Sequence, residues 1–309
     1  MKFWVGNALQ TASWYTSRFG FEYMAYKGLE TGERQCSSHV IRNNNIIFEF
    51  CSSYDPEDGQ GIGEHIKRHG DGVRDVAFTV DDARGIYEKA IKRGAKSVLE
   101  PMELKDDDGV VIIASLRTYG DTIHTLVQRN GYKGLFLPGY KAHHSVEVFN
   151  DIMEPIVLDA IDHCVGNQPE GDMEPTAQWY EKMLDFHRFW SVDDTMMHTE
   201  YSALRSIVMA DFDEVVKMPI NEPAQGKRKS QIQEYVDFWA GAGVQHIALR
   251  TQDIIGTVEK LKKRGIKFLD IPTSYYNNLR KNIPNLSIQI KEDIDLIEKY
   301  KILIDYDDK

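Results

Sequence analysis

Cysteine, long apolar runs and excess positive charge are all scarce in this sequence. Only 3 of the 309 residues are cysteine, at positions 36, 51 and 164, which does not suit a disulfide framework. Lys and Arg number 37 against 48 Asp and Glu, and the resulting net charge of −11 argues against a nucleic-acid partner. Apolar runs such as residues 45–50 are far shorter than the roughly 20 residues that span a bilayer. With no visible signal peptide in the first fifteen residues, we expect a globular, cytoplasmic chain with free thiols.

The sequence contains an internal duplication. Residues 82–101 (DARGIYEKAIKRGAKSVLEP) and 253–272 (DIIGTVEKLKKRGIKFLDIP) are identical at nine positions, at a constant offset of 171 residues. A second repeat relates TASWY at 11–15 to TAQWY at 176–180. The length also fits two domains that each bury a core. These repeats predict four modules arranged as two pseudo-symmetric domains.

Each module has the pattern of a βαβββ unit. A β-like run comes first, an amphipathic helix follows, and several short alternating strands complete the unit. The capping residues agree between modules: Asn7 and Gly20 flank a helix over 8–19, Asp82 and Gly94 flank the second, and Asp253 and Gly265 flank the fourth. Alternation predicts strands over 121–127 and 206–210. The fold class is therefore α+β, with paired modules forming half-closed sheets whose concave side can hold a ligand.

The domain boundary is placed between residues 135 and 157. Residues 136–156 contain Pro138-Gly139, His143-His144 and Pro155 and show little periodicity, which is typical of a linker. We expect a non-catalytic N-terminal domain over residues 1–135 and a catalytic, iron-binding C-terminal domain over 157–309.

Two histidines stand out among the ten in the chain. The offset of 171 aligns Asp75 with His246, so only the second copy carries an imidazole at this position. His163 lies in the opening strand of module three, as His246 does in module four, and pseudo-symmetry brings the two together. With a third, carboxylate ligand they would form the facial triad of non-haem Fe(II) oxygenases, although zinc also fits such ligands. The alternative is two separately satisfied core histidines.

Several long strings resemble one enzyme family, from Phe3 to the last residues. They occur at residues 3–8 (FWVGNA), 28–32 (GLETG), 69–73 (HGDGV), 161–169 (IDHCVGNQP), 187–194 (HRFWSVDD), 217–223 (KMPINEP), 230–235 (SQIQEY) and 243–249 (GVQHIAL). The chain is similar to the 4-hydroxyphenylpyruvate dioxygenases, whose vicinal-oxygen-chelate fold, also that of glyoxalases, consists of paired βαβββ units.

The resemblance implies an Fe(II)-dependent dioxygenase of tyrosine and phenylalanine catabolism. It would convert 4-hydroxyphenylpyruvate and O₂ to homogentisate and CO₂, as a homodimer without nucleic-acid or membrane partners. The motif match makes His163 and His246 iron ligands, and makes Gln231 and Gln245 catalytic as well as substrate-binding residues. Ser206 and Asn221 fall where the family places polar contacts to the substrate.

These polar residues also have structural alternatives. Ser206 and Asn221 could serve strand-edge or turn hydrogen bonds, and Gln231 and Gln245 could be satisfied core amides. Asp162 precedes His163 directly, and strand alternation turns adjacent side chains to opposite faces, so we expect a structural role for Asp162.

The sequence departs from the family pattern at both ends. Module four stops at Lys309 without its closing strands, and the chain begins abruptly at Met1. In the family, the C-terminal segment carries the glutamate ligand, aromatic residues that hold the substrate ring and a covering helix. None of Glu259, Asp270, Glu292 and Asp305 maps onto a closing strand, so no carboxylate replaces that glutamate. We expect a truncated chain that binds iron weakly and turns over poorly, and whose activity a family-like C-terminal segment restores.

Two other functions stay open at this point. A related dioxygenase uses the same iron and substrate but hydroxylates the benzylic carbon to give 4-hydroxymandelate. A catalytically inactive truncated form that serves in dimerisation or binding is the third possibility.

Overall fold

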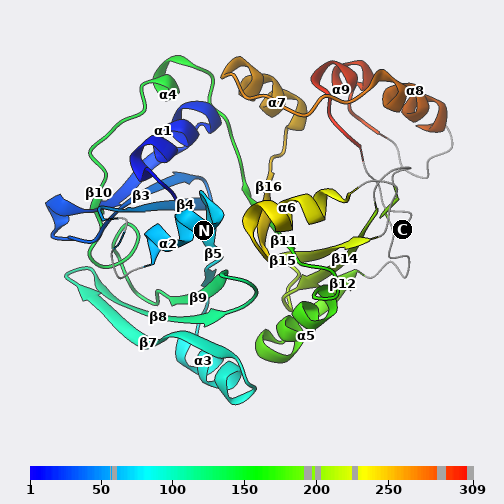
Figure 1. Ribbon diagram of the computed structural model, residues 1–309. Helices are drawn as coiled ribbons and strands as arrows, with labels where there is room; N and C mark the ends of the chain where they lie inside the picture. The colour runs from blue at the N-terminus through cyan, green and yellow to red at the C-terminus, as the bar shows by residue number, and fades with distance from the viewer. Residues whose placement is uncertain are drawn as a thin grey trace.

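The computed structural model describes residues 1–55, 57, 61–190, 197–198, 203–224, 229–283 and 290–304. Within these residues the strands form two sheets, one from each half of the chain, which stand side by side in Figure 1. This arrangement agrees with the fold class expected from the repeats.

The first sheet has ten strands. Their order is β10-β2-β3-β4-β1-β5-β9-β8-β7, and β6 pairs with β9. The central strand β1 runs parallel to β4 and antiparallel to β5. The strands are β1 (Lys2–Trp4), β2 (Glu22–Lys27), β3 (Cys36–Asn43), β4 (Ile46–Ser53), β5 (Gly72–Asp75), β6 (Phe78–Thr79), β7 (Lys96–Asp106), β8 (Gly109–Arg117), β9 (Ile123–Gln128) and β10 (Lys141–Ala142).

The second sheet has six strands in the order β12-β14-β15-β11-β16, with β13 paired to β14. Its strand β11 runs parallel to β15 and antiparallel to β16, and β1 has the same relation to β4 and β5. The internal duplication read from the sequence is thus repeated in the strand pairing. The strands are β11 (Ala160–Asn167), β12 (His187–Trp190), β13 (Met197–His198), β14 (Ala203–Ala210), β15 (Lys217–Ala224) and β16 (Gly243–Arg250).

The helix boundaries predicted from capping residues are confirmed. Helix α1 begins after Asn7, whose Oδ1 accepts the Gln10 N–H at 3.0 Å, and ends before Gly20 at a φ of 68°. Asp82 and Asp253 cap α3 and α7 in the same way. The helices are α1 (Ala8–Phe19), α2 (Ile62–His69), α3 (Ala83–Lys92), α4 (Phe149–Ile152), α5 (Met173–Leu184), α6 (Gln231–Trp239), α7 (Ile254–Lys263), α8 (Thr273–Asn282) and α9 (Ile294–Tyr300), and Leu29–Thr31 form a 3₁₀ turn.

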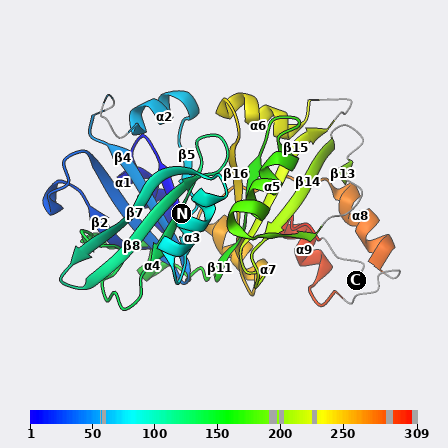
Figure 2. The ribbon, with the colours of Figure 1, turned by 90° about the horizontal axis from the view of Figure 1, so that it is seen from below.

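One hydrophobic core joins the two halves. It combines Phe48 and Phe50 of the first sheet with Met218 and Ile220 of the second, and Tyr180 of α5 lies fully buried in it. Helices α2 and α6 lie next to each other along one side of the molecule, as Figure 2 shows, and each packs on its own sheet. Helix α6 therefore covers part of the faces of β11 and β15 that point away from this core, near Gly243.

The predicted linker contains regular structure. Strand β10 pairs with β2, and α4 forms a single turn, so residues 136–156 are more ordered than their lack of periodicity suggested. The exact domain limits stay a prediction. In module four, β16 and α7 are followed by α8 and α9, and the described residues there form no further strand. No helix within the described ranges has the length and apolar character needed to cross a membrane.

Candidate functional site

His163 and His246 lie on neighbouring strands with their rings together. In the antiparallel pair β11–β16, Val165 is opposite His246 and His163 is opposite Ala248, so the two imidazoles share one face of the sheet. Their ring centroids are 5.6 Å apart. The juxtaposition expected from pseudo-symmetry is therefore present in the structure.

Each imidazole is held by the residue that precedes it. Asp162 Oδ2 accepts a hydrogen bond from His163 Nδ1 at 2.8 Å, and Gln245 Oε1 contacts His246 Nδ1. Adjacent side chains normally point to opposite faces of a strand. Here the register of β11 against β16 shifts between Ile161 and His163, and again between Val165 and Gly166. These bulges let neighbouring side chains meet. The expectation that Asp162 and His163 point to opposite faces was therefore wrong. That Asp162 is not a metal ligand stays a prediction.

The hydrogen bonds at Nδ1 leave both Nε2 atoms for a metal. Neither Nε2 makes a hydrogen bond within the part of the chain that the structure describes. Burial, together with the nearby His163 ring, lowers the pKa of His246 and favours its neutral form, which is the ligand form. An oriented imidazole with an acceptor on Nδ1 is the usual arrangement in metal sites. The pair fits two of the positions around Fe(II) or Zn²⁺.

A third ligand is not present among the described residues. No cluster of three His, Cys, Asp or Glu side chains with metal-binding geometry occurs in them. Glu259 pairs with Lys263 at 3.3 Å, and Asp270 lies 3.7 Å from Lys301 on the surface. Glu292 is exposed, and Asp305 falls outside the described residues. Of these carboxylates, the three that the structure describes therefore supply no ligand to the histidine pair.

The four polar candidates occupy different parts of this domain. Ser206 on β14 and Asn221 on β15 are directly opposite each other and share the face of His163. Gln245 contacts His246. Gln231 is the first residue of α6, is exposed and forms no hydrogen bond in the described ranges, so no contact links it to the other candidates. Asn167 follows His163 by four residues on the same strand, and its side chain was not singled out from sequence although period-2 alternation places it on this face.

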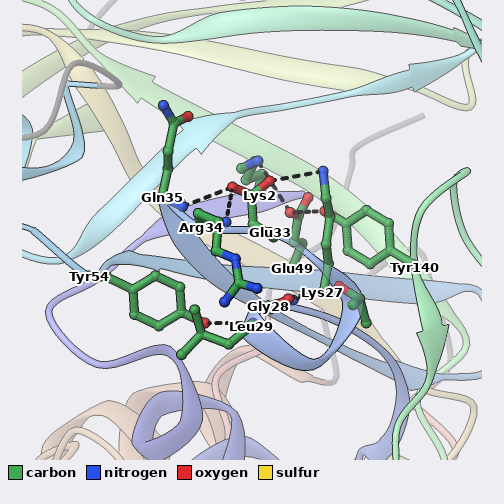
Figure 3. Close-up of polar contacts among 11 residues, drawn as sticks. Lys2, Lys27, Gly28, Leu29, Glu33, Arg34, Gln35, Glu49, Tyr54 and Tyr140 are labelled. Carbon is green, nitrogen blue, oxygen red and sulfur yellow. Dashed lines mark hydrogen bonds and ion pairs between the residues drawn. The ribbon is translucent and has the colours of Figure 1, made fainter.

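The equivalent region of the first domain is occupied by its own side chains. Asp75, at the position of His246, accepts hydrogen bonds from the Thr125 backbone N–H and hydroxyl. Figure 3 shows Glu49 between Lys2 and Tyr140, with Lys2 Nζ at 3.2 Å and the Tyr140 hydroxyl at 2.6 Å. Burial favours the neutral acid, but Lys2 and Tyr140 outweigh it and hold the pKa of Glu49 below its usual value. This ion pair and the bound Asp75 occupy the position that corresponds to the His163–His246 pair, so no imidazole pair lies at that position among the described residues.

A cavity of about 340 Å³ adjoins His163 and Lys217, at one end of the strand face just described. Asp75, Thr125 and Phe78 line it from the first domain, and His163 and Lys217 line it from the second. His246, Ser206, Asn221, Gln231 and Gln245 do not contribute to its wall. We therefore place the candidate site on the strand face and not in this cavity.

Comparison with known proteins identifies relatives along the whole chain. The model of the Glyoxalase/Bleomycin resistance protein/Dioxygenase superfamily matches residues 1–122 and 160–292. The chain is 58% identical to a 4-hydroxyphenylpyruvate dioxygenase of Tetrahymena thermophila, covering 100% of this chain and 78% of the relative. It is 56% identical to the enzyme of the same name from Dictyostelium discoideum, covering 99% of this chain and 84% of that protein.

Solved structures show the same fold. A mutant of 4-hydroxymandelate synthase from Streptomyces coelicolor superposes with a TM-score of 0.83 at 23% identity, over 99% of this chain and 83% of the other. A fusion protein of a xylose isomerase-like TIM barrel with a 4-hydroxyphenylpyruvate dioxygenase gives 0.70 at 17% identity, over 99% of this chain and 44% of the fusion. At these identities the structural matches support the fold alone.

Proposed function

The chain belongs to the 4-hydroxyphenylpyruvate dioxygenase family, and from that premise we propose that it is an Fe(II)-dependent dioxygenase converting 4-hydroxyphenylpyruvate and O₂ to homogentisate and CO₂. The observation that carries the proposal is the imidazole pair of His163 and His246, oriented through Nδ1 on one sheet face. The corresponding place in the first domain holds Asp75.

The side chains of the second domain prepare this site for a metal. His163 and His246 would hold Fe(II) through Nε2, while Asp162 keeps the Nδ1 proton of His163 in place. When bound, the iron supplies the redox chemistry that couples O₂ to decarboxylation of a 2-oxo acid and hydroxylation of its ring. Gln245 uses its amide oxygen on His246, so its amide NH₂ is left to donate to a substrate oxygen.

The remaining candidates would orient the substrate. Ser206 and Asn221 present a hydroxyl and an amide side by side, on the face that carries His163. Asn221 is 8% exposed, so a hydrogen bond to it forms away from bulk water. Gln231, the exposed first residue of α6, would contact the substrate from the start of that helix.

Homogentisate is the product that the comparisons favour over 4-hydroxymandelate. The relatives named 4-hydroxyphenylpyruvate dioxygenase include those at 58% and 56% identity, whereas the mandelate synthase shares 23% and supports only the fold. The same relatives favour an enzyme over a purely binding protein. A role in tyrosine and phenylalanine catabolism follows from this reaction.

We also propose a cytoplasmic homodimer. Cys36, Cys51 and Cys164 are all buried and unpaired, which suits a reducing compartment. The dimer rests on the family resemblance, and the mass of the purified chain in solution tests it.

The test of the proposed function is product formation. The chain is incubated with Fe(II), O₂ and 4-hydroxyphenylpyruvate, and homogentisate is quantified by mass spectrometry. We expect little product from the 309-residue chain alone. Joined to a family C-terminal segment, the wild type and the surface variant His187→Ala should form product, and His163→Ala and His246→Ala should form none. Because the described residues lack a third ligand, the assay is repeated on the chain joined to the C-terminal segment of the Tetrahymena relative. Absence of homogentisate from both forms would refute the function.

A further inference from the structure

Asn167 extends the polar row formed by Ser206 and Asn221. In the parallel pair β11–β15, Asn167 is opposite Asn221, which is itself opposite Ser206 on β14. Asn167 shares the face of His163, four residues earlier on the same strand. Gly166 confirms this direction, because a Cβ at Gly166 would meet the buried Tyr119 hydroxyl at 2.5 Å, on the opposite face.

The amide of Asn167 is buried without partners. Its side chain is 0% exposed, and neither Oδ1 nor Nδ2 has a hydrogen-bond partner within the described part of the chain. A buried amide that leaves both its donor and its acceptor unused destabilises the fold. The amide of Asn167 therefore lowers the stability of the fold unless a group from outside the described chain binds to it.

The first domain shows a different filling of the same strand position. Trp4 is opposite Gly72 just as Asn167 is opposite Gly243, and the row Ser206–Asn221–Asn167 corresponds to Ser38–Cys51–Trp4. Trp4 packs with Cys51 and Ile62, and the Arg74 guanidinium stacks on its ring at 4.6 Å. An apolar filling is thus compatible with this fold. The amide at position 167 does not follow from the architecture.

We propose that Asn167 is a specificity-determining residue that binds the ring hydroxyl of the substrate, an inference that rests on the proposed function. Asn167 lies four positions after His163 on the strand, about 13 Å between their Cα atoms, and the two side chains reach into this span. A compound whose acid end lies at the imidazole pair therefore directs its ring toward Asn167. A phenol both donates and accepts, so Oδ1 takes its proton while Nδ2 donates to its oxygen.

The experiment compares 4-hydroxyphenylpyruvate with phenylpyruvate, which lacks the hydroxyl. Binding of each to the Fe(II)-loaded chain is measured by calorimetry without O₂, for the wild type, Asn167→Leu and Asn167→Ala. We expect both variants to weaken binding of 4-hydroxyphenylpyruvate about 10- to 100-fold and to leave phenylpyruvate unchanged. Leu has nearly the shape of Asn and removes the unpaired amide, so the melting temperature should stay equal or rise.

Each contrary result has one meaning. If the variants weaken both compounds equally and also melt earlier, Asn167 is structural and the inference is overturned. If they bind both compounds as the wild type does, Asn167 does not contact the ring. In either case a wild type that prefers 4-hydroxyphenylpyruvate keeps the proposed function intact, whereas a wild type that binds neither compound overturns that function and this inference together.

Discussion

Asp162 offers a quantitative test of how this chain prepares a metal ligand. Its Oδ2 lies 2.8 Å from His163 Nδ1, and the side chains are 38% and 31% exposed. Asp162→Ala removes the acceptor and leaves the His163 ring free to rotate. We expect Fe(II) affinity to fall although Asp162 itself is not a ligand.

The expected loss follows from the exposure of the pair. A hydrogen bond to a charged group contributes about 1.5–3 kcal/mol when sheltered, and solvent screening reduces this for groups that are about one-third exposed. We take a loss of about 1–1.4 kcal/mol, which raises the dissociation constant for Fe(II) about five- to tenfold. Asp162→Asn keeps an acceptor without the charge, and neutral hydrogen bonds are roughly half as strong, so about two- to threefold is expected.

Competition between the protein and a fluorescent chelator for Fe(II) measures these affinities. Asp159→Ala is the matched control, because Asp159 precedes the same strand and accepts a hydrogen bond from Gln252 Nε2 at 2.6 Å, away from His163. We expect wild-type affinity for this control. Equal affinities of Asp162→Ala and wild type, alongside a large loss in His163→Ala, would refute the idea that Asp162 positions the ligand.

Two further predictions concern stability. His124 is fully buried, with Nδ1 on the Val76 carbonyl and Nε2 accepting from the Tyr180 hydroxyl, and burial lowers its pKa to about 4. The unfolded chain takes up a proton on this imidazole near pH 6.5, whereas the folded chain does so only near pH 4, so the free energy of unfolding falls by about 3 kcal/mol between these two pH values. Urea unfolding of His124→Gln should lose this part of the pH dependence. An unchanged pH dependence in the variant would contradict the assignment. A Cβ at Gly72 would lie 2.3 Å from the Trp239 ring, so Gly72→Ala should lower the free energy of unfolding by about 1–3 kcal/mol, and an unaltered urea midpoint would show that the ring moves freely.

Local signals in the sequence predict most of the helices and the pairing of the halves. Three helices begin where a capping side chain accepts a backbone N–H group of the first turn, and the capping residues are Asn7, Asp82 and Asp253. This signal is local, so it can be read from the sequence without knowledge of the tertiary structure. The shared position of His163 and His246 in the opening strands of modules three and four then places the two side by side. The capping residues and the matching strand positions can both be read directly from the sequence.

The details of the site depend on features that sequence periodicity does not reveal. Strict alternation separates Asp162 from His163, but a register shift of β11 against β16 brings them within hydrogen-bonding distance. Likewise, Asn167 reads as an ordinary strand residue until its burial and unpaired amide are known. Bulges and unsatisfied buried groups arise from how strands meet, and neither has a signature in the local pattern.

The most direct test of the central claim is the position of iron in the protein. Crystals of the chain soaked anaerobically with Fe(II) are measured at the iron absorption edge. We expect one anomalous peak at about 2.0–2.2 Å from Nε2 of both His163 and His246, lost in His246→Ala. A peak elsewhere, for example at His39 and His143, whose rings share a hydrogen bond of 2.8 Å, with none at His163, would contradict the account.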